Sequence, residues 1–574
     1  MRNRFLTLLL CLALAGFAAA CRARATPSPA LTAAMPTAPT VAPIAGAPTR
    51  TTQAEAPSVP QQRDALVVAM TRDPLSLDPG DLVDAPGLPV LRQIFDTLTG
   101  LGPNGEITPV LATGWRANSD ATEWAFTLRQ GVRFHDGTSL TPSAVKFNFD
   151  RWIDPDFAAG ARSEGKQFQV WSDIFGGYRG SGSLVTDVIA GDNGEVTFHL
   201  SRPAAYFPAF LALPYFGISS PDAVARVGAR YGAPDGGAVG TGPFRLKEWQ
   251  PGMLRLERYA DYWGGAAASD TLTFQALGDP DTQLAALVDG RADLAPDIPV
   301  DRAAAAQARG LVPIPRPQLA VSYLGINQRY RPLNDSRVRQ AIANALDGAA
   351  LVAALPSQSA IPADQFIPPS LCCRIGPPGS ASSAKARDLL AQAGFQNGLS
   401  EVAGPDGKLR RLELWYSSPP LGPSAAPLAK AIAAQLEAAG IKAVLREDEW
   451  ASFLAERKQG QFPLFLLSYP TPSGRSEALD DPFAFLNPLF GPLSVGETGY
   501  SKPAVLDALR QGETNADMDR RREVYQQVAQ MLRDDSPRVP LVYPLGLAVI
   551  RRGVEGYAAS VLGAESLAPV RAPR

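Results

Sequence analysis

Histidine and cysteine are scarce in this chain of 574 residues, and their scarcity limits its chemistry. The only histidines are His135 and His199, and neither has a partner histidine at the spacing of metal ligands. Of the four cysteines, only Cys372 and Cys373 are neighbours in the sequence. They could close a vicinal disulfide, but the pattern favours two small thiols in a loop. We therefore expect no disulfide framework, no metal site and no other cofactor.

Sequence motifs of enzymes are missing as well. No GxSxG elbow, HExxH pair, P-loop or GxGxxG run occurs. His135 precedes a turn at 136–137 and His199 falls on the polar face of a predicted strand, so ordinary hydrogen-bonded surface roles are expected for both. Adjacent carboxylates such as Asp480 and Asp481 are weak grounds for acid/base chemistry. We expect no catalytic residues, and an exported hydrolase is kept as the alternative.

A strong net charge is also absent. The formal net charge is -2, with 45% hydrophobic and 19% charged residues, which is the composition of a folded protein. Nucleic acid is not an expected partner, because the chain carries no excess of basic residues to attract it. The length is several times that of a typical single domain, so two or more lobes are expected.

The N-terminus reads as an export signal. Arg2 and Arg4 precede an apolar run at 6–20 that is too short to span a bilayer. Ala18 and the two alanines after it lead into Cys21, and this resembles the lipobox of bacterial lipoproteins, in which the cysteine is diacylated after cleavage. Lipoboxes usually carry Leu in the place of Ala18, so cleavage by ordinary signal peptidase is the alternative. We expect a signal peptide at 1–20 and lipid attachment at Cys21.

The next segment, 21–63, is rich in Ala, Pro and Thr. Such a composition buries too little apolar surface to fold, and its prolines make it extended and semi-rigid. It predicts a tether that holds a folded body, beginning at Asp64, away from a membrane. No second long apolar segment follows, so we expect an exported monomer, anchored by lipid to the outer face of the cytoplasmic membrane or held in the periplasm.

The folded body alternates predicted strands with amphipathic helices. A strand is expected at Ala65–Met70, and 123–129 alternates apolar with polar residues as a strand with one buried face does. The clearest unit is a strand at 412–416, a helix with apolar residues at four-residue spacing up to Gly440, and a strand at 441–445. Such a βαβ unit implies a parallel sheet and an α/β fold. A further helix is expected at 338–350.

Several separated stretches together resemble a known family. The densest is 109–152, PVLATGWRANSDATEWAFTLRQGVRFHDGTSLTPSAVKFNFDRW, which reads as strand, turn and helix, with Thr141 as the cap and Pro142 at the first helical position. Further matches lie at 239–263, 284–294, 338–347 (VRQAIANALD), 384–395 (AKARDLLAQAGF) and 519–540. They are similar to the bacterial extracellular solute-binding proteins of family 5, which include dipeptide, oligopeptide and nickel receptors of ABC transporters.

This resemblance implies an α/β, two-lobed, periplasmic-binding-protein-like (type II) fold with a hinged cleft between the lobes. By analogy, lobe I comprises 64–315, with an extra subdomain at about 103–203. Lobe II comprises 316–536, and the tail 537–574 returns to lobe I. The partners implied are a small-molecule or peptide ligand and the permease subunits of an ABC transporter.

Candidate ligand contacts follow from the predicted sheet. Ligands of open α/β lobes bind at the carboxyl ends of parallel strands, and two such ends occur here. One supplies Trp415, Tyr416 and Ser417, and the other supplies Ser468 and Tyr469. Successive strand residues face opposite ways, so we expect only one of Trp415 and Tyr416 to face the cleft and the other to pack in the core.

In the first lobe, Asp73 matches the place where oligopeptide receptors carry an acid near their ligand, and Leu75 is its neighbour. A turn-forming aspartate is the alternative for Asp73.

The chain departs from the family just before Asp481 and Pro482. Peptide receptors usually carry an aspartate upstream of this DP pair that binds the α-amino group of the ligand, and the corresponding residue here is Ala478. The nearest charged residues are Arg475, Glu477 and Asp480. Of these, Arg475 and Asp480 are candidate ligand contacts. The departure weakens the peptide assignment more than the fold assignment.

The sequence therefore favours a binding protein that closes on a peptide or peptide-sized solute and delivers it to a permease. A receptor for a nickel chelate or an oligosaccharide is one alternative. A ligand-loaded sensor that signals to a membrane partner is another.

Overall fold

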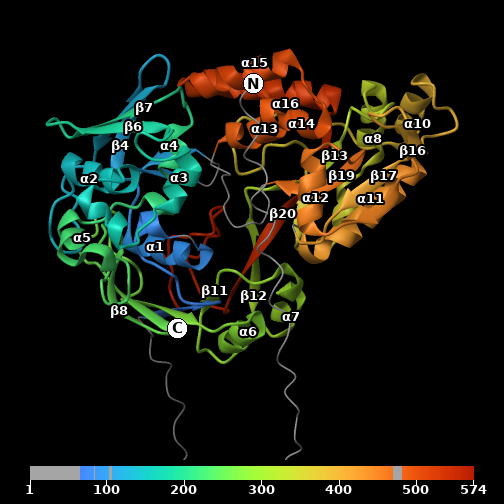
Figure 1. Cartoon of the computed structure of the whole chain (residues 1–574). Helices are drawn as coiled ribbons and strands as arrows, with labels where there is room; N and C mark the ends of the chain where they lie inside the picture. The colour runs from blue at the N-terminus through green and yellow to red at the C-terminus, as the bar shows by residue number, and fades with distance from the viewer. Residues whose placement is uncertain (1–64, 83, 103–105, 420, 470–480, 574) are drawn as a thin grey trace, which may run out of the picture. The chain divides into compact units, whose positions relative to one another are not determined.

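The computed structural model describes residues 65–82, 84–102, 106–419, 421–469 and 481–573 (Figure 1). Its largest sheet has twelve strands, ten of which follow the order β18-β17-β19-β13-β20-β11-β1-β10-β9-β8, while β12 and β14 also pair with β20. The strands of this sheet are β1 (Ala65–Met70), β8 (Phe244–Gln250), β9 (Met253–Arg258), β10 (Thr271–Ala276), β11 (Leu294–Ala295), β12 (Val312–Pro317), β13 (Val321–Ile326), β14 (Ala360–Pro362), β17 (Glu413–Tyr416), β18 (Val444–Glu447), β19 (Leu464–Tyr469) and β20 (Arg538–Ile550).

Among the described residues the remaining strands form smaller sheets, and the α-helices pack against the large sheet or against the four-stranded one. The strands are β2 (Thr99–Leu101), β3 (Ile107–Pro109), β4 (Ala112–Ala117), β5 (Glu123–Leu128), β6 (Val185–Ala190), β7 (Glu195–Leu200), β15 (Glu401–Ala403) and β16 (Leu409–Arg411). The helices are α1 (Leu88–Ile94), α2 (Pro142–Ile153), α3 (Gln169–Phe175), α4 (Phe207–Phe210), α5 (Pro221–Val227), α6 (Pro280–Val288), α7 (Ala303–Ala308), α8 (Ser336–Ala345), α9 (Gly348–Ala353), α10 (Ser383–Gln392), α11 (Ala425–Ala438), α12 (Trp450–Lys458), α13 (Pro482–Phe490), α14 (Val495–Thr498), α15 (Pro503–Thr514) and α16 (Met518–Asp535). In the described part of the chain, no helix is both long and apolar enough to cross a bilayer.

Strand β19 shows how the second lobe is built. Every residue from Leu464 to Ser468 is buried, and their side chains alternate between the two faces of the sheet. Leu464 and Leu466 join a core with apolar residues of α8, α10 and α11. Phe465 and Leu467 join a second core with residues of α12, α13, α15 and α16. The sheet therefore lies between two helical layers, which explains the continuous apolar run of this strand.

The first lobe has separate cores, and β20 belongs to both lobes. Its residues 538–542 pair with β13, and Leu545 to Ile550 pair with β12. In the second half, Ala548 and Ile550 pack with β1 and β10, whereas Leu547 and Val549 pack with α6 and α7. One strand of 13 residues thus joins two independently packed α/β bodies.

A four-stranded sheet in the order β4-β5-β7-β6 forms an additional unit with α2 and α3. Its core is aromatic: the ring of Phe149 lies 4.7 Å from that of Phe198, and the ring of Trp171 lies 4.2 Å from that of Phe175. The predicted start of α2 is confirmed, because the backbone N–H of Ala144 donates to Thr141 Oγ1 at 3.1 Å.

The predicted βαβ unit is confirmed, since β17 and β18 are parallel neighbours joined through α11. Gly440 follows the helix with φ 85°, a conformation that favours glycine. The single helix expected at 338–350 is instead two helices, α8 and α9. The first ends at Ala345, because Leu346 is extended, and Asp347 caps the second by accepting from Ala349 N and Ala350 N at 2.8 and 3.1 Å.

One segment that carries the family resemblance, 239–263, is held to a buried carboxylate outside it, Asp96. It accepts hydrogen bonds from Thr241 Oγ1 at 2.9 Å, from Tyr262 at 3.2 Å and from Trp263 Nε1 at 2.8 Å. Burial raises the pKa of Asp96, although these donors oppose the shift. This part of the resemblance therefore marks packing of the first lobe.

His135 ties the turn at 136–137 to the same region. Its Nε2 lies 2.9 Å from the carbonyl oxygen of Gly242, and Nδ1 accepts from Gly240 N at 3.4 Å. The side chain is half-buried, so the expected surface role is wrong for this histidine, although its hydrogen bonds were anticipated. Burial lowers the pKa of His135 to about 4, so the ring is neutral at pH 7.

We predict that His135 makes stability fall on mild acidification. The pKa is lowered in the folded state, so between pH 6.5 and about 4 the unfolded chain takes up a proton that the folded chain does not. The free energy of unfolding should lose up to about 3 kcal/mol from this residue across that range. Urea unfolding at pH 7 and pH 4.5 should show a smaller drop for His135→Gln than for the wild type. An equal drop in both proteins would contradict the prediction.

Candidate functional site

A pocket of about 290 Å³ lies between elements of the additional unit and the end of β19 with α13. The residues from the first side are Asp173, Ile174, Gly176, Arg202, Tyr206 and Phe210. Those from the second side are Tyr469, Asp481, Phe483, Ala484, Asn487 and Pro488. The pocket is thus formed by segments far apart in the sequence, at the end of β19 where a ligand was expected.

Aromatic rings form much of its wall. Tyr206 stacks flat on Phe483, with ring centroids 5.1 Å apart and an angle of 7° between the planes. Tyr469 donates its hydroxyl to the carbonyl of Ala484 at 3.0 Å. Burial raises the pKa of Tyr206 to about 12, so its hydroxyl stays neutral over the physiological range. These rings offer apolar faces with neutral polar edges, which suits an organic solute.

The two sides also touch through backbone. The N–H of Ala205 donates to the carbonyl oxygen of Glu513 on α15 at 2.8 Å. Burial raises the pKa of the Glu513 carboxyl, and the nearby exposed Arg202 opposes that shift. With the stacked pair of Tyr206 and Phe483, this hydrogen bond holds the additional unit against α13 and α15.

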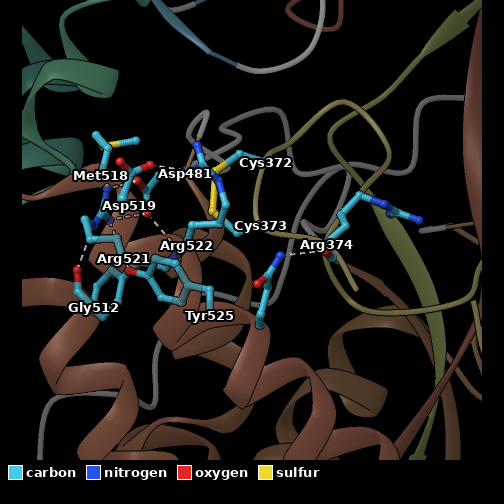
Figure 2. Close-up of a disulfide and its surroundings, with 12 residues drawn as sticks. Cys372, Cys373, Arg374, Asp481, Gly512, Met518, Asp519, Arg521, Arg522 and Tyr525 are labelled. Carbon is cyan, nitrogen blue, oxygen red and sulfur yellow. Dashed lines mark hydrogen bonds and ion pairs between the residues drawn. A yellow bond between two sulfur atoms is a disulfide. The ribbon is translucent and has the colours of Figure 1, made fainter. Parts of the chain in front are cut away.

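Asp481 has a structural role at the pocket edge. Its Oδ1 accepts from Phe483 N at 2.9 Å and caps α13. The same carboxylate forms a buried ion pair with Arg521, with Oδ2 to Nη1 at 2.8 Å, as Figure 2 shows. Asp481 raises the pKa of Arg521, against the effect of burial. Its charge is therefore already balanced inside the protein and is not available to a cationic ligand.

Of the predicted contacts on β17, Trp415 is half-buried and stacks on Phe462, with centroids 4.7 Å apart. Tyr416 is buried on the opposite face and donates to Glu447 Oε2 at 3.2 Å. The opposite orientation of the two rings follows the alternation expected of a strand. Ser417 is buried and donates to the carbonyl of Asp448 at 3.0 Å. None of these three predicted residues lines the 290 Å³ pocket.

The other candidates lie in different places. Ser468 is buried, with its hydroxyl 3.3 Å from that of Ser322, whereas the adjacent Tyr469 lines the pocket. Asp73 Oδ2 accepts from Gly252 N at 2.7 Å, so it supports the turn between β8 and β9. Leu75 is 65% exposed and does not line the pocket. The remaining candidates, which are Cys21, Arg475 and Asp480, and the neighbouring Glu477 and Ala478, lie outside the described residues.

Sequence reasoning missed Tyr206, Phe483 and Arg202. The available signals were the aromatic stretch RPAAYFPAF at 202–210 and the phenylalanine directly after the DP pair. Nothing in either stretch alone indicates that they face each other, because their contact depends on the tertiary fold.

Cys372 and Cys373 form a vicinal disulfide, which corrects the prediction of two thiols (Figure 2). Cys373 is buried in the core beside the α13 and α16 layer and has φ 70°, a left-handed conformation that the sequence does not reveal. The loop is held by Arg374, which donates to Asp364 Oδ1 at 2.6 Å and to the Tyr543 hydroxyl at 3.1 Å. The described residues contain no group of three or more His, Cys, Asp or Glu that could hold a metal ion.

Comparisons with known proteins agree with this geometry. The family model described as Bacterial extracellular solute-binding proteins, family 5 Middle, matches residues 106–496. The glutathione-binding protein GsiB of Salmonella typhi is 28% identical over 492 residues, which cover 84% of this chain and 89% of that protein. The dipeptide-binding protein of Escherichia coli (strain K12) is 27% identical over 506 residues, with the same coverage. HbpA2 from Haemophilus parasuis has a TM-score of 0.76 at 25% identity, covering 89% of this chain and 100% of that one. The likeness confirms the predicted two-lobed type II fold.

We predict an energetic coupling between Tyr206 and Phe483. Stacked aromatic pairs contribute about 0.5–1.5 kcal/mol beyond the area that they bury. Unfolding free energies of Tyr206→Ala, Phe483→Ala and the double variant should give a coupling energy in that range. The control pair, Tyr206→Ala with Trp415→Ala, removes two aromatic rings that do not stack on each other and should be additive. Additive losses for Tyr206 and Phe483 would contradict the contact.

Proposed function

Because the chain belongs to the bacterial extracellular solute-binding proteins of family 5, we propose that it captures a short peptide between its lobes and delivers it to the permease of an ABC importer. It is a binding protein and not an enzyme. The observation that carries the proposal is the pocket in which Tyr206 and Phe483 meet from opposite sides. A solute held there contacts both lobes at once.

The polar groups of the pocket suit one end of a peptide. Arg202 is exposed at its edge, where a guanidinium can bind a ligand carboxylate. Asp481 is paired with Arg521 and does not serve an α-ammonium group. We propose that this group is bound by an acidic residue near Ala478, where Glu477 and Asp480 are the candidates from the sequence. The names of the dipeptide-binding and glutathione-binding relatives support a peptide over a chelate or an oligosaccharide.

Closure of the two lobes would distinguish the ligand-bound protein from the unliganded one. A ligand that touches both lobes stabilises the closed form by the difference between its affinities for the closed and open forms. The chain crosses between the lobes at 318–320 and within β20, so we propose that the hinge lies there. The lobe boundaries at 315/316 and 536/537 and the subdomain at 103–203 belong to the same proposal.

We further propose that Cys21 carries a lipid and that 21–63 tethers the binding body at the outer face of the cytoplasmic membrane. The sequence of 18–21 supports this assignment. The tether would keep the loaded protein close to its permease and raise the effective concentration of the pair.

The ligand class is tested by thermal shift with a dipeptide, a tripeptide, reduced glutathione, maltotriose and a nickel–histidine chelate. A ligand that binds only the folded state raises the melting temperature, and we expect this for the peptides. Tyr206→Ala should weaken peptide binding about tenfold, because an aromatic wall is lost. Leu493→Ala, at a side chain that is 92% exposed outside the pocket, is the control and should leave binding unchanged. Shifts with maltotriose or the chelate alone would overturn the peptide assignment.

Lipid attachment is tested separately in cells. Labelled palmitate should enter the wild-type protein and be absent from Cys21→Ser, which should move to the soluble fraction. A soluble, unlabelled wild-type protein would mean that ordinary signal peptidase removes the leader.

A further inference from the structure

A second pocket, of about 480 Å³, lies within the second lobe. It is bounded by the end of α8, by two stretches of the loop that carries Cys372, by the last turns of α16 and by the start of β20. Val539 and Pro540 line it and pair with Leu324 and Tyr323 of β13. Tyr469 of the interlobe pocket pairs with Val321, toward the other end of the same strand. The register therefore separates the two pockets along the sheet.

Part of the lining of this second pocket is apolar. Its buried apolar residues come from the loop, α8, α13, α16 and β20, and they are Leu346, Phe366, Ile367, Leu486, Ala529, Leu532 and Val539. Gln365, Ser536 and Arg538 are buried polar residues of the same lining. The volume falls within the range of about 300–1,000 Å³ that small-molecule sites occupy. The apolar part of the lining fits the hydrocarbon part of a small organic molecule.

Two of the five charged residues of the lining are already in ion pairs. Asp364 accepts from Arg374 Nη2 at 2.6 Å, and Arg538 lies 3.3 Å from Glu497 Oε2. Asp534 at the edge is exposed, and its Oδ1 accepts from Gln530 at 2.7 Å along α16. Asp364 and Arg538 therefore offer no free charge to a ligand, whereas Asp534 keeps a negative charge without an ion-pair partner among the described residues.

Two cations remain. Lys385 on α10 is exposed and makes no ion pair with any described residue. Arg533 donates from Nη2 to the carbonyl of Gly376 at 2.5 Å, but its buried Nε has no hydrogen-bond partner in the described part of the chain. With Asp534 as the only unpaired anion of the lining, one positive charge is in excess. A pocket with one apolar wall and a positive edge is complementary to a molecule that is apolar at one end and carries a carboxylate at the other.

We propose that this pocket is a second binding site, which takes a small organic monocarboxylate. The ligand places its hydrocarbon part against Phe366, Ile367 and Leu532, and its carboxylate binds Lys385 and the guanidinium of Arg533. Since the site is separate from the interlobe pocket, its occupation does not depend on the proposed peptide.

The experiment is calorimetric titration of the full mature chain with 3-phenylpropionate and with its neutral match, 3-phenylpropanamide. We expect the acid to bind at least tenfold more tightly than the amide. Lys385→Gln should weaken binding of the acid about tenfold, and Ala343→Leu, which fills the pocket from α8, should weaken it further. Lys430→Gln removes a lysine from α11 in the same lobe and should change nothing.

Several outcomes would overturn the site. Equal affinity for acid and amide would remove the role of the cations, and retained binding in both Lys385→Gln and Ala343→Leu would place the probe elsewhere. Loss of binding in Tyr206→Ala, with Lys385→Gln unaffected, would place it between the lobes. Melting curves of each variant establish folding, and Lys385→Gln changes an exposed side chain, so the test stands even if Ala343→Leu does not fold.

Discussion

The backbone pairing of β20 is the constraint on which the two-lobed arrangement depends. A single strand forms hydrogen bonds with β13 in one lobe and with β12 in the other, and its side chains enter the cores of both. Helices cover the sheet in each lobe, so the hinge proposed above falls where pairing passes from one part of the sheet to the other. The proposed solute site lies between the bodies that this strand connects. Closure can then change the distance across the pocket without repacking either core.

Buried charges determine which groups a ligand can use. Asp481 lies at the edge of the interlobe pocket, but it already caps α13 and neutralises Arg521. Removing either partner would leave an uncompensated buried charge, so the pair belongs to the fold. Arg202, by contrast, is exposed at the same pocket. The site therefore combines a fixed, neutral aromatic wall with a guanidinium that a solute can reach.

Local signals in the sequence predicted much of the fold. The bounds of β1 are as predicted, the βαβ unit around α11 is confirmed, and Thr141 caps α2. These features depend on residues close together in the chain. The break between α8 and α9 was missed because the apolar spacing continues across it, although Leu346 is extended and Asp347 caps a new helix.

The site was less predictable. Tyr469 was predicted because it lies at the end of a strand, and that rule uses one chain segment only. The rings that stack across the pocket, Tyr206 and Phe483, come from two distant parts of the sequence. The vicinal disulfide likewise depends on a left-handed residue that composition does not disclose. Contacts between distant segments and unusual backbone angles are the properties that are hardest to predict from a single sequence.

The stack of Tyr206 on Phe483 has a consequence for the empty receptor. The two rings attract each other across the lobes without a ligand. A contact of about 1 kcal/mol multiplies the ratio of closed to open molecules about fivefold. Under the proposed function, a fraction of the unliganded protein would then resemble the ligand-bound protein to an ABC transporter. An importer served by such a binding protein would need some means of distinguishing the ligand-bound from the unliganded closed form, or it would hydrolyse ATP without transport.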